Sequence, residues 1–508
     1  MSRNPRKKLG IGYAGRRRWE QRAGFDLAHK ATYVPGERGF LEAEHLPRFD
    51  PRPRRKPRRL ARLAGLALSA ILVFTGFGTS LAQAQGISLL RDTETEDMLR
   101  SYETPLAKAA GLDPVPRVWL IGSPEINAFA TYGDGGENIF ILSGILLDVK
   151  TPNELIGVMA HETGHIAAGH LSRSAQGMKK AMIPMLLSMV LGAAAMAMGA
   201  GDAGMVIMGA GSAMAAAQMA AFTRVQESTA DQIALKLLNA THQSPMGIYS
   251  TFERFANEQA QSAYKIDKFA VDHPVGQDRL ADIETKVNAS PYRDVKDPPQ
   301  VMHTFEMVQA KLAGFTLPVQ QALDRYPETD TSEPARYARA MVYMRKPDLA
   351  KALSTTNSLI QDEPNNPFFY EVLGQIHVSM AKPQLAIPAY QKAVDLRPDA
   401  PQLRLGLAVA QLATSDPRLA NAALQNLKAA SLRENDDVFT WYETAQAYSL
   451  LKNEPMANLS TAEAYYNSGA MRQAAVFALR ARRGLEQGSP DWQRANDIIG
   501  VVGAQQQR

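Results

Sequence analysis

The chain carries the sequence TPNELIGVMAHETGHIA at residues 151–167. Thr151 and Glu154 have the spacing of a capping box, and Pro152 occupies the first helical position, so a helix is predicted to begin here. Apolar residues then recur close to helical spacing, at Leu155, Val158, Met159 and Ile166. The stretch therefore predicts a helix that runs through both of its histidines.

His161, Glu162 and His165 form an HExxH pattern on this predicted helix. Residues four positions apart share one helix face, so both imidazoles can bind the same metal ion. Glu162 then lies where it can act as the general base toward the attacking water. Because the pentapeptide also arises by chance, its interpretation as a zinc site depends on finding a third ligand.

A catalytic zinc site needs a third protein ligand, which can be His, Glu or Asp. The extended pattern HExxHxxGxxH is not met, because Ala168 and Leu171 stand where its glycine and last histidine would be. His170 comes one position early. We expect it to face away from the metal and to bond backbone or water.

Glu227 and Asp231 lie four positions apart in the sequence QESTAD, residues 226–231, at the start of a further predicted helical run. One carboxylate can bind zinc while the other bonds the free N–H of a ligand histidine. The alternative is an exposed acidic helix face without a metal. The HExxH pattern upstream favours the ligand interpretation.

His273 is a further candidate, in the sequence DHPVGQDRL at residues 272–280. Pro274 biases the preceding residue toward an extended conformation, which suits a loop that projects into a site. The alternative is an ordinary loop histidine.

Three motifs follow one another along the chain: HExxH at residues 161–165, ExxAD at 227–231 and HPxxxxR at 273–279. Upstream lie the segments NAFA at 127–130 and IFILSG at 139–144. In this order the motifs resemble the zinc peptidases related to the CAAX-prenyl proteases and HtpX, whose edge strand the upstream segments resemble. With the C-terminal repeats described below, the chain resembles the family of periplasmic β-barrel assembly-enhancing proteases.

This resemblance implies a role for each candidate residue. The implied zinc ligands are His161, His165 and Glu227, for one zinc ion per chain. Glu162 would activate the water, and Asp231 would be a supporting carboxylate or proton donor. His273 would either stabilise the tetrahedral intermediate or occupy the fourth zinc position in a resting state. The implied partners are misassembled outer-membrane proteins and their assembly machinery.

Positive charge is concentrated at the N-terminus. Residues 1–84 hold 18 Lys and Arg against 6 Asp and Glu, which leaves 38 against 45 in the rest of the chain. The overall charge of +5 therefore belongs to this leader. A basic surface on the remaining chain is not indicated, and we expect no nucleic-acid binding.

The leader has the layout of a secretory signal peptide. Residues 52–62 are densely basic, residues 63–77 are apolar, and AQA at residues 82–84 is an A-x-A cleavage site. We expect cleavage near Ala84 and export to the periplasm. The chain has no cysteine, which is compatible with an oxidising compartment. An uncleaved membrane anchor is the alternative.

Residues 181–222 contain a single charge, Asp202, and are dominated by Ala, Met and Gly. The segment is weakly hydrophobic for a membrane span, and Pro184 and Gly192 interrupt it. Two short helices joined near residues 199–204 are therefore expected. The pair either contacts lipid or unfolded clients at its periphery, or packs over the protease core.

The C-terminal third repeats with a period of 34 residues. Ala352, Ala386 and Ala420 are 34 residues apart, as are Pro364 and Pro398. This period is that of a tetratricopeptide repeat, in which small and large residues nest two helices. We expect roughly four stacked helix pairs from about residue 333 to 490, with a concave surface suited to extended protein segments.

These observations predict a mainly α protein: a zincin-type metalloprotease domain with a small edge sheet, followed by an α-solenoid of tetratricopeptide repeats. The predicted divisions are 1–84 (extension and signal peptide), 86–297 (protease), 300–332 (linking helices), 333–490 (repeats) and 491–508 (tail). The predicted function is a secreted zinc-dependent endopeptidase that degrades misassembled outer-membrane β-barrel proteins and assists their assembly. The alternatives are a chaperone or scaffold with a normally closed zinc site, and an integral membrane protease.

Overall fold

The computed structural model describes residues 37–38, 89–133, 136–197, 201–261, 269 and 272–505. The chain divides into two units, residues 1–35 and 36–508, and the first lies entirely outside the described residues. The predicted basic stretch at 52–62, the apolar stretch at 63–77 and the cleavage site near Ala84 also lie outside them.

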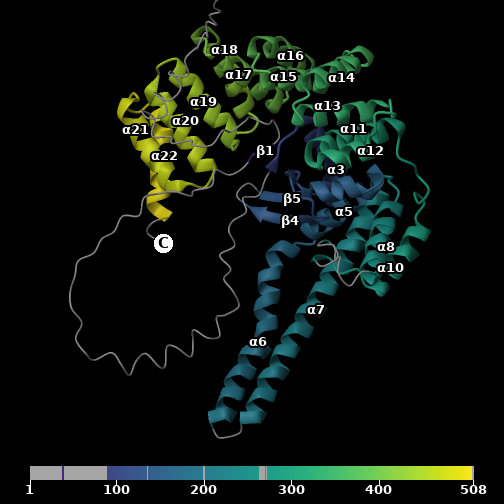
Figure 1. Ribbon diagram of the computed structural model, residues 1–508. Coiled ribbons are helices and arrows are strands. Elements are labelled where there is room, and N and C mark those ends of the chain that lie inside the picture. The colour runs from purple at the N-terminus through teal and green to yellow at the C-terminus, as the bar shows by residue number, and fades with distance from the viewer. Residues whose placement is uncertain are drawn as a thin grey trace, which may run out of the picture. The chain divides into compact units, whose positions relative to one another are not determined.

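A five-stranded mixed sheet belongs to the first half of the chain, with strand order β1-β2-β3-β5-β4 (Figure 1). The strands are β1 (Glu37–Arg38), β2 (Leu89–Leu90), β3 (Arg117–Ile121), β4 (Ala128–Gly133) and β5 (Gly136–Leu142). β3 and β5 are parallel, and β4 is antiparallel to β5. The outer edge of β4 has no partner strand among the described residues. Of the two segments that resemble the edge strand of the family, residues 127–130 lead into β4 at the edge, whereas residues 139–142 belong to β5, between β3 and β4.

Helices pack against this sheet and form one large core with it. They are α3 (Thr93–Ala110), α4 (Ser143–Asp148), α5 (Pro152–Ala167), α8 (Met246–Gln261) and α10 (Gln277–Ala289). The predicted start of α5 is confirmed, because the Thr151 side chain accepts a hydrogen bond from the Glu154 N–H and Pro152 is at the first position. Burial of its apolar residues on several sides makes α5 the central helix of the domain.

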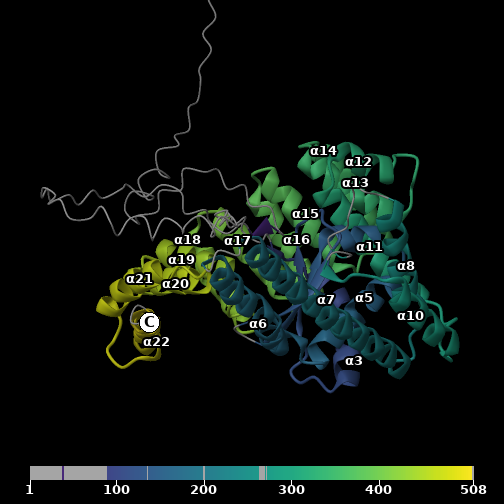
Figure 2. The same ribbon diagram turned by 90° about the horizontal axis from the view of Figure 1, so that it is seen from below.

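Two long helices, α6 (His170–Ala197) and α7 (Gly201–Ala240), form an antiparallel hairpin. Figures 1 and 2 both show them side by side. The expected pair of helices joined near residues 199–204 is confirmed, since α6 ends at Ala197 and α7 begins at Gly201. The expectation that both are short was wrong, because α6 continues through positions 184 and 192 without a break. Close packing along the partner helix sustains α6 where local sequence predicted an interruption.

The contact between α5 and α7 depends on a glycine. A Cβ atom added at Gly164 would lie 2.6 Å from the carbonyl oxygen of Ala230 on α7. Only a residue without a side chain permits this approach. The close approach brings the ExxAD segment of α7 against the HExxH segment of α5.

The second half of the chain is a series of helix pairs that begins after a proline-containing connection. Its helices are α11 (Pro299–Thr316), α12 (Val319–Arg325), α13 (Glu333–Arg345), α14 (Leu349–Asp362), α15 (Pro367–Ser379), α16 (Pro383–Leu396), α17 (Pro401–Ala413), α18 (Pro417–Ser431), α19 (Val438–Leu450), α20 (Glu454–Asn467), α21 (Met471–Gly484) and α22 (Pro490–Gln505). The predicted fold class, a mainly α chain with a small sheet and a helical solenoid, is confirmed.

The repeat period is visible in the packing between these helices. Ala352, Ala386 and Ala420 are fully buried. Tyr390 is wedged between Gly374 and Gly406, where an added Cβ would lie 2.6 Å and 2.4 Å from its ring. The small residues therefore make room for one large aromatic residue between successive pairs.

The solenoid extends further than expected. The sequence predicted roughly four helix pairs and a tail from residue 491, whereas α21 and α22 form a fifth pair. Ala495 and Ile498 of α22 are fully buried in one cluster with α20 and α21. The helix was missed because it does not continue the 34-residue pattern, although it covers the apolar end of the array.

Buried charges connect the protease region to the helix pairs. Lys311 of α11 is paired with Asp92, and its Nζ lies 3.3 Å from Glu94 Oε2 and 3.4 Å from Glu371 Oε2 of α15. Tyr337 of α13 donates to Glu94 at 2.8 Å. Removing one member would leave buried charge uncompensated, so this cluster holds α3, α11, α13 and α15 together.

Substituting Gly164 with alanine is expected to destabilise the protein by about 1–3 kcal/mol, because the new methyl group forces α5 away from α7. The measurement is the midpoint of urea unfolding. Gly209→Ala on α7 is the matched control, since nothing lies within 4 Å of its added Cβ. Equal midpoints for the two variants would contradict the close-contact argument.

Candidate metal centre

The two histidines of α5 face each other in the interior of the protease region. His161 and Glu162 are fully buried, and His165 is nearly so. The Nε2 atoms of His161 and His165 are 3.1 Å apart. The helix therefore places both ring nitrogens at one point, as its i, i+4 spacing predicted.

Glu227 of α7 reaches the same point from the neighbouring helix. Its Oε2 lies 3.3 Å from His161 Nε2, and its Oε1 lies 3.4 Å from His165 Nε2. The carboxylate is buried. The third candidate ligand is thus brought against the histidine pair by the approach of α7 to α5 at Gly164.

His273 enters the cluster from a loop. Its Nδ1 lies 3.2 Å from His161 Nε2 and 3.3 Å from Glu227 Oε2, and its Nε2 lies 3.4 Å from Glu162 Oε1. Asn127, just before β4, donates to Asp272 at 2.9 Å. The loop that carries His273 is therefore attached to the beginning of the edge strand.

Further polar groups contact the Nδ1 atoms of the cluster's histidine rings, on the side away from the cluster centre. Asp231 Oδ1 lies 3.0 Å from His161 Nδ1, and Arg279 donates two hydrogen bonds of 2.8 Å to the Asp231 carboxylate. The Nδ1 atoms of His165 and His170 are 3.0 Å apart. His170 lies on the side of His165 that points away from the cluster centre, as expected. The expectation that its ring bonds only backbone or water was incomplete, because it contacts the His165 ring.

Burial and neighbouring charges fix the protonation of these rings. Burial opposes a charge on His161, but Asp231 and Glu227 outweigh it and raise its pKa to about 9. Burial and the charge of His161 lower the pKa of His165 to about 2. Burial opposes a charge on Glu227 too, yet His161 and His273 hold its pKa well below the usual range. Without a metal ion, His161 therefore holds a positive charge at neutral pH, while His165 stays neutral and Glu227 stays ionised.

The donor set fits a metal cation. His161, His165, Glu227 and His273 each offer one nitrogen or oxygen, and these atoms all lie within 4.8 Å of one another. Asp231 and His170 face the Nδ1 atoms, so in the neutral, metal-binding form of the two rings we assign the ring protons there and the lone pairs to the Nε2 atoms. Two imidazole lone pairs and a carboxylate that converge at one buried point suit a cation such as Zn²⁺.

A buried glutamate near this cluster was not predicted from the sequence. Glu103 of α3 is fully buried, and both its carboxyl oxygens lie 3.0 Å from the Thr163 hydroxyl oxygen. The Thr163 hydroxyl donates to the carbonyl of Met159 at 2.7 Å, so it can accept a hydrogen bond from the protonated Glu103 carboxyl. Burial, with a smaller effect from the charge of Glu162, raises its pKa to about 8. Thr163 is a variable position of HExxH, so the motif itself gives no sign of this contact.

A second group of possible metal donors lies at the beginning of the helix pairs. His303, Glu333 and Glu363 have donor atoms within 4.8 Å of one another, and all three are only partly buried. His303 Nε2 lies 3.4 Å from Glu333 Oε2. The cluster of His161, His165, Glu227 and His273 differs from it in two ways. Its donors are all buried, and neighbouring side chains orient its imidazole rings.

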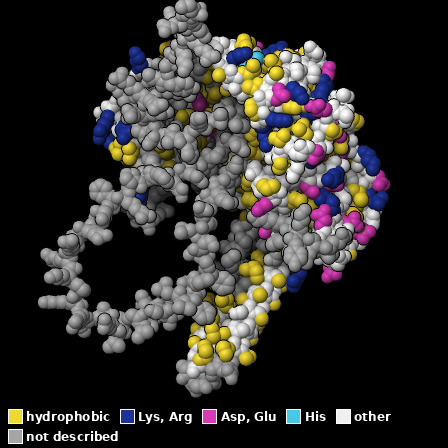
Figure 3. All heavy atoms as spheres, in the orientation of Figure 1, with side chains coloured by type: hydrophobic (Ala, Val, Ile, Leu, Met, Phe, Trp, Pro, Cys, Tyr) yellow, Lys and Arg dark blue, Asp and Glu magenta, His cyan; other side chains and the backbone are white. Residues whose placement is uncertain are grey.

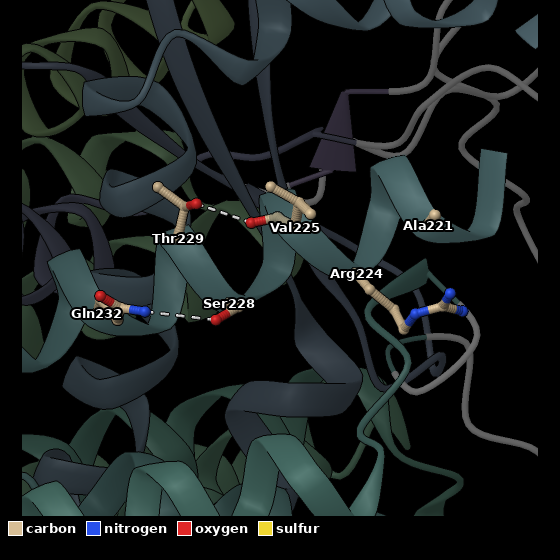
Figure 4. Close-up of a pocket in the computed structure, with 6 residues that line it drawn as sticks. All are labelled: Ala221, Arg224, Val225, Ser228, Thr229 and Gln232. Atoms are coloured by element: carbon tan, nitrogen blue, oxygen red, sulfur yellow. Dashed lines mark hydrogen bonds between the residues drawn. The ribbon is translucent and has the colours of Figure 1, made fainter. Parts of the chain in front are cut away.

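The surface hollows on α7 lie beside the cluster rather than at its centre. One, of about 260 Å³, is lined by His170 and by residues of α7 such as Gln226 and Ile233. The other lies along α7 alone, between Ala221 and Gln232, and Figure 4 shows Thr229 bonded to the carbonyl of Val225 and Gln232 to Ser228 within the helix. Neither contains Glu162 or a donor of the cluster.

Comparison with known proteins bears on the same region. Residues 93–287 match the family model described as Peptidase family M48. The chain is 27% identical over 378 residues to the beta-barrel assembly-enhancing protease of Escherichia coli, covering 73% of this chain and 75% of that protein. It is 34% identical over 121 residues to a protease HtpX homolog of Bacillus licheniformis, covering 22% and 41%. The resemblance inferred from the motifs is thereby confirmed.

Among solved structures, the tetratricopeptide repeat protein YrrB, described as having an unusual peptide-binding site, matches 35% of this chain and 91% of its own. The sequence identity is 20% and the TM-score is 0.29, which is too low to support an argument.

The raised pKa of Glu103 predicts a pH-dependent stability. The folded state holds the proton up to about pH 8, while the unfolded carboxyl loses it near its usual value of 4.5. Stability is therefore lost as the pH rises through this window. Glu103→Gln should remove the part of this loss that Glu103 causes, worth on the order of a few kcal/mol above pH 8.

Urea-unfolding midpoints of wild type and variant, measured at about pH 5 and about pH 9, test this. Glu284→Gln, at an exposed position of α10, is the control and should follow wild type at both values. A Glu103→Gln variant that follows wild type at both pH values would show that the carboxyl does not titrate in this window.

Proposed function

We propose, from the M48 peptidase domain that residues 93–287 form, that the protein is an exported zinc-dependent endopeptidase of protein quality control. The observation that carries this proposal is the convergence of His161, His165 and Glu227 at one buried point beside Glu162. The proposed ligands are these two histidines and Glu227, with Glu162 as general base. Asp231 and His273 are the proposed supporting groups.

The residues around the proposed zinc site have separate tasks. When bound, zinc supplies Lewis acidity toward the scissile carbonyl. Glu162 takes the proton from the attacking water, and its burial, which raises its pKa, favours holding that proton. Asp231 and Arg279 fix the ring of His161, and His170 fixes that of His165.

The substrate would bind as an added strand on the outer edge of β4. The backbone N–H of Ala130 in β4 hydrogen-bonds Glu162, so this strand passes directly beside the proposed base. A polypeptide paired with an edge strand is held extended by main-chain hydrogen bonds. Its scissile bond would then lie next to the cluster, so the proposed enzyme would cleave internal peptide bonds.

The proposed clients are misassembled outer-membrane β-barrel proteins, as the name of the Escherichia coli relative suggests. The helix pairs α13 to α22 offer a large surface for partly folded segments away from the proposed catalytic groups. The leader pattern of residues 52–84 supports a periplasmic location. The proposed division of the chain is a leader to 84, a protease domain at 86–297, linking helices and a repeat domain.

A second function is favoured by the position of His273. Its Nδ1 lies as close to His161 Nε2 as the second ligand histidine does, at 3.2 Å against 3.1 Å. In this arrangement the loop closes the site, and the protein would act chiefly as a chaperone or scaffold. Outer-membrane assembly that is fully retained in a Glu162→Gln strain would support this alternative over the peptidase.

Glu162→Gln should leave bound zinc unchanged and lower the cleavage rate of an unfolded substrate such as casein by about 10²–10⁴-fold, because the base is lost while the ligands remain. Elemental analysis and a fluorescent peptide-release assay measure the two quantities. The control is Glu284→Gln, on the surface of α10. Cleavage at the wild-type rate would exclude Glu162 as the base.

His165→Ala and Glu227→Gln should each lose the zinc ion, because each removes one of three proposed ligands. His273→Ala should retain it and change the cleavage rate. Zinc content per chain, measured after dialysis against a weak chelator, distinguishes these outcomes. Full zinc occupancy in either of the first two variants refutes the ligand set, and loss in the third makes His273 an obligatory ligand.

A further inference from the structure

The hairpin of α6 and α7 exposes large apolar side chains along its length. In both helices these side chains are between half and three-quarters exposed: Ile183, Leu186, Leu187, Val190, Leu191, Met205, Val206 and Met214. Figure 3 shows this apolar surface along the hairpin. Met205–Ala240 is long and apolar enough to cross a membrane, and only 6% of its most apolar window is buried. A core helix of the same composition would be covered.

The seam between the two helices has the opposite character. Its buried positions are occupied by small residues, Ser188 and Gly192 of α6 and Gly211 of α7. A water-soluble helical hairpin turns its large apolar residues inward and its polar residues outward. Here the buried positions among the described residues hold small residues, and eight large apolar residues are at least half exposed. Helices packed within lipid show this arrangement, because small residues permit close backbone approach and lipid solvates the outward side chains.

Two hydroxyl groups of the hairpin form hydrogen bonds within it, and its other described uncharged polar side chain, Gln218, is exposed toward the base. The Ser188 hydroxyl donates to the carbonyl of Met185 at 2.8 Å, and the Ser212 hydroxyl donates to that of Met208 at 3.1 Å. All backbone groups of a continuous helix are paired internally apart from its ends. The two helices therefore contain little that requires water along their length.

Charges are distributed as a bilayer requires. Between residues 181 and 222 the single charge is Asp202, at the far end of the hairpin, where α7 begins. The base carries Arg173, Lys179, Lys180 and Arg224 in sequence. Arg224 is exposed, and Figure 4 shows it extending from α7 away from Thr229 and Gln232. Basic groups at the base of an inserted hairpin would lie at the level of the lipid headgroups, where they are complementary to anionic lipids.

The length of the apolar part also fits. From Gly201 to Phe222, α7 extends about 33 Å at the helical rise per residue. The hydrocarbon core of a bilayer is about 30 Å thick. Asp202 can therefore reach the opposite headgroup region while Arg224 remains at the near one.

We propose that the α6–α7 hairpin, residues 181–222, inserts into an anionic lipid bilayer with its basic base at the headgroups. The hairpin then holds the protease region at a membrane surface, and α7 connects the inserted segment to Glu227 and Asp231 without interruption. This proposal goes beyond the peptidase function and does not depend on it.

The absence of cysteine permits a site-specific test in the full chain. Leu187→Cys and Met214→Cys are labelled with an environment-sensitive fluorophore and mixed with vesicles of phosphatidylcholine containing about 30% phosphatidylglycerol. Both labels should shift to shorter wavelength and be quenched by lipids brominated in the acyl chain. Leu432→Cys, on the helix pairs and 87% exposed, is the matched control and should do neither.

The readout is local, so binding of the apolar leader at residues 63–77 cannot imitate it. Labels at 187 and 214 that stay in water at saturating lipid overturn the proposal. So does a response to an unfolded protein, reduced and alkylated lactalbumin, without a response to vesicles, since the hairpin would then bind clients. An equal response to neutral vesicles would overturn the headgroup assignment.

A second pair of variants measures the energetic contribution of the apolar surface. Leu187→Asp combined with Val190→Asp should weaken vesicle binding at least about 10-fold, because charged side chains are disfavoured in hydrocarbon. Both positions are exposed, so the unfolding midpoint should stay unchanged. Leu432→Asp should bind vesicles like wild type. Unchanged binding of the double variant would overturn the proposal.

Discussion

The close approach of α5 to α7 at Gly164 is the constraint on which the rest of the protein depends. HExxH alone supplies two imidazoles and a glutamate, which can bind a metal only weakly without a third ligand. The backbone contact between Gly164 and Ala230 brings Glu227 within 3.4 Å of both Nε2 atoms. The other end of α7 forms one arm of the exposed apolar hairpin, with α6 as the second arm. One helix therefore belongs both to the proposed catalytic centre and to the proposed membrane contact.

Electrostatics favour a cation at the centre of this contact. Asp231 and Glu227 raise the pKa of His161, whereas burial and the His161 charge lower that of His165. A divalent metal ion would displace the proton from His161 Nε2 and present two positive charges to all the donors. Arg279 neutralises Asp231 on the outer side, and it also lies 3.1 Å from Glu227. The proposed zinc site is thus supported by groups that do not themselves bind the ion.

Features that depend on a local repeat period or a helix cap could be predicted from the sequence. The Thr151 cap, the HExxH face and the 34-residue repeat were predicted because each depends on neighbours along the chain. Contacts between residues that are far apart in the sequence could not be predicted from it. Glu103 meets Thr163 across 60 residues, and His170 turns back to His165 because Gly169 adopts a positive φ of 65°. The length of α6 also depends on packing against α7, which overrides the expected break at Pro184.

Anomalous diffraction at the zinc absorption edge from crystals of the zinc-loaded protein tests the central claim most directly. The account predicts one strong peak within bonding distance of His161 Nε2, His165 Nε2 and a Glu227 oxygen, at about 2.0–2.2 Å. Zinc bound at His303, Glu333 and Glu363, with no peak between the helices α5 and α7, would contradict it.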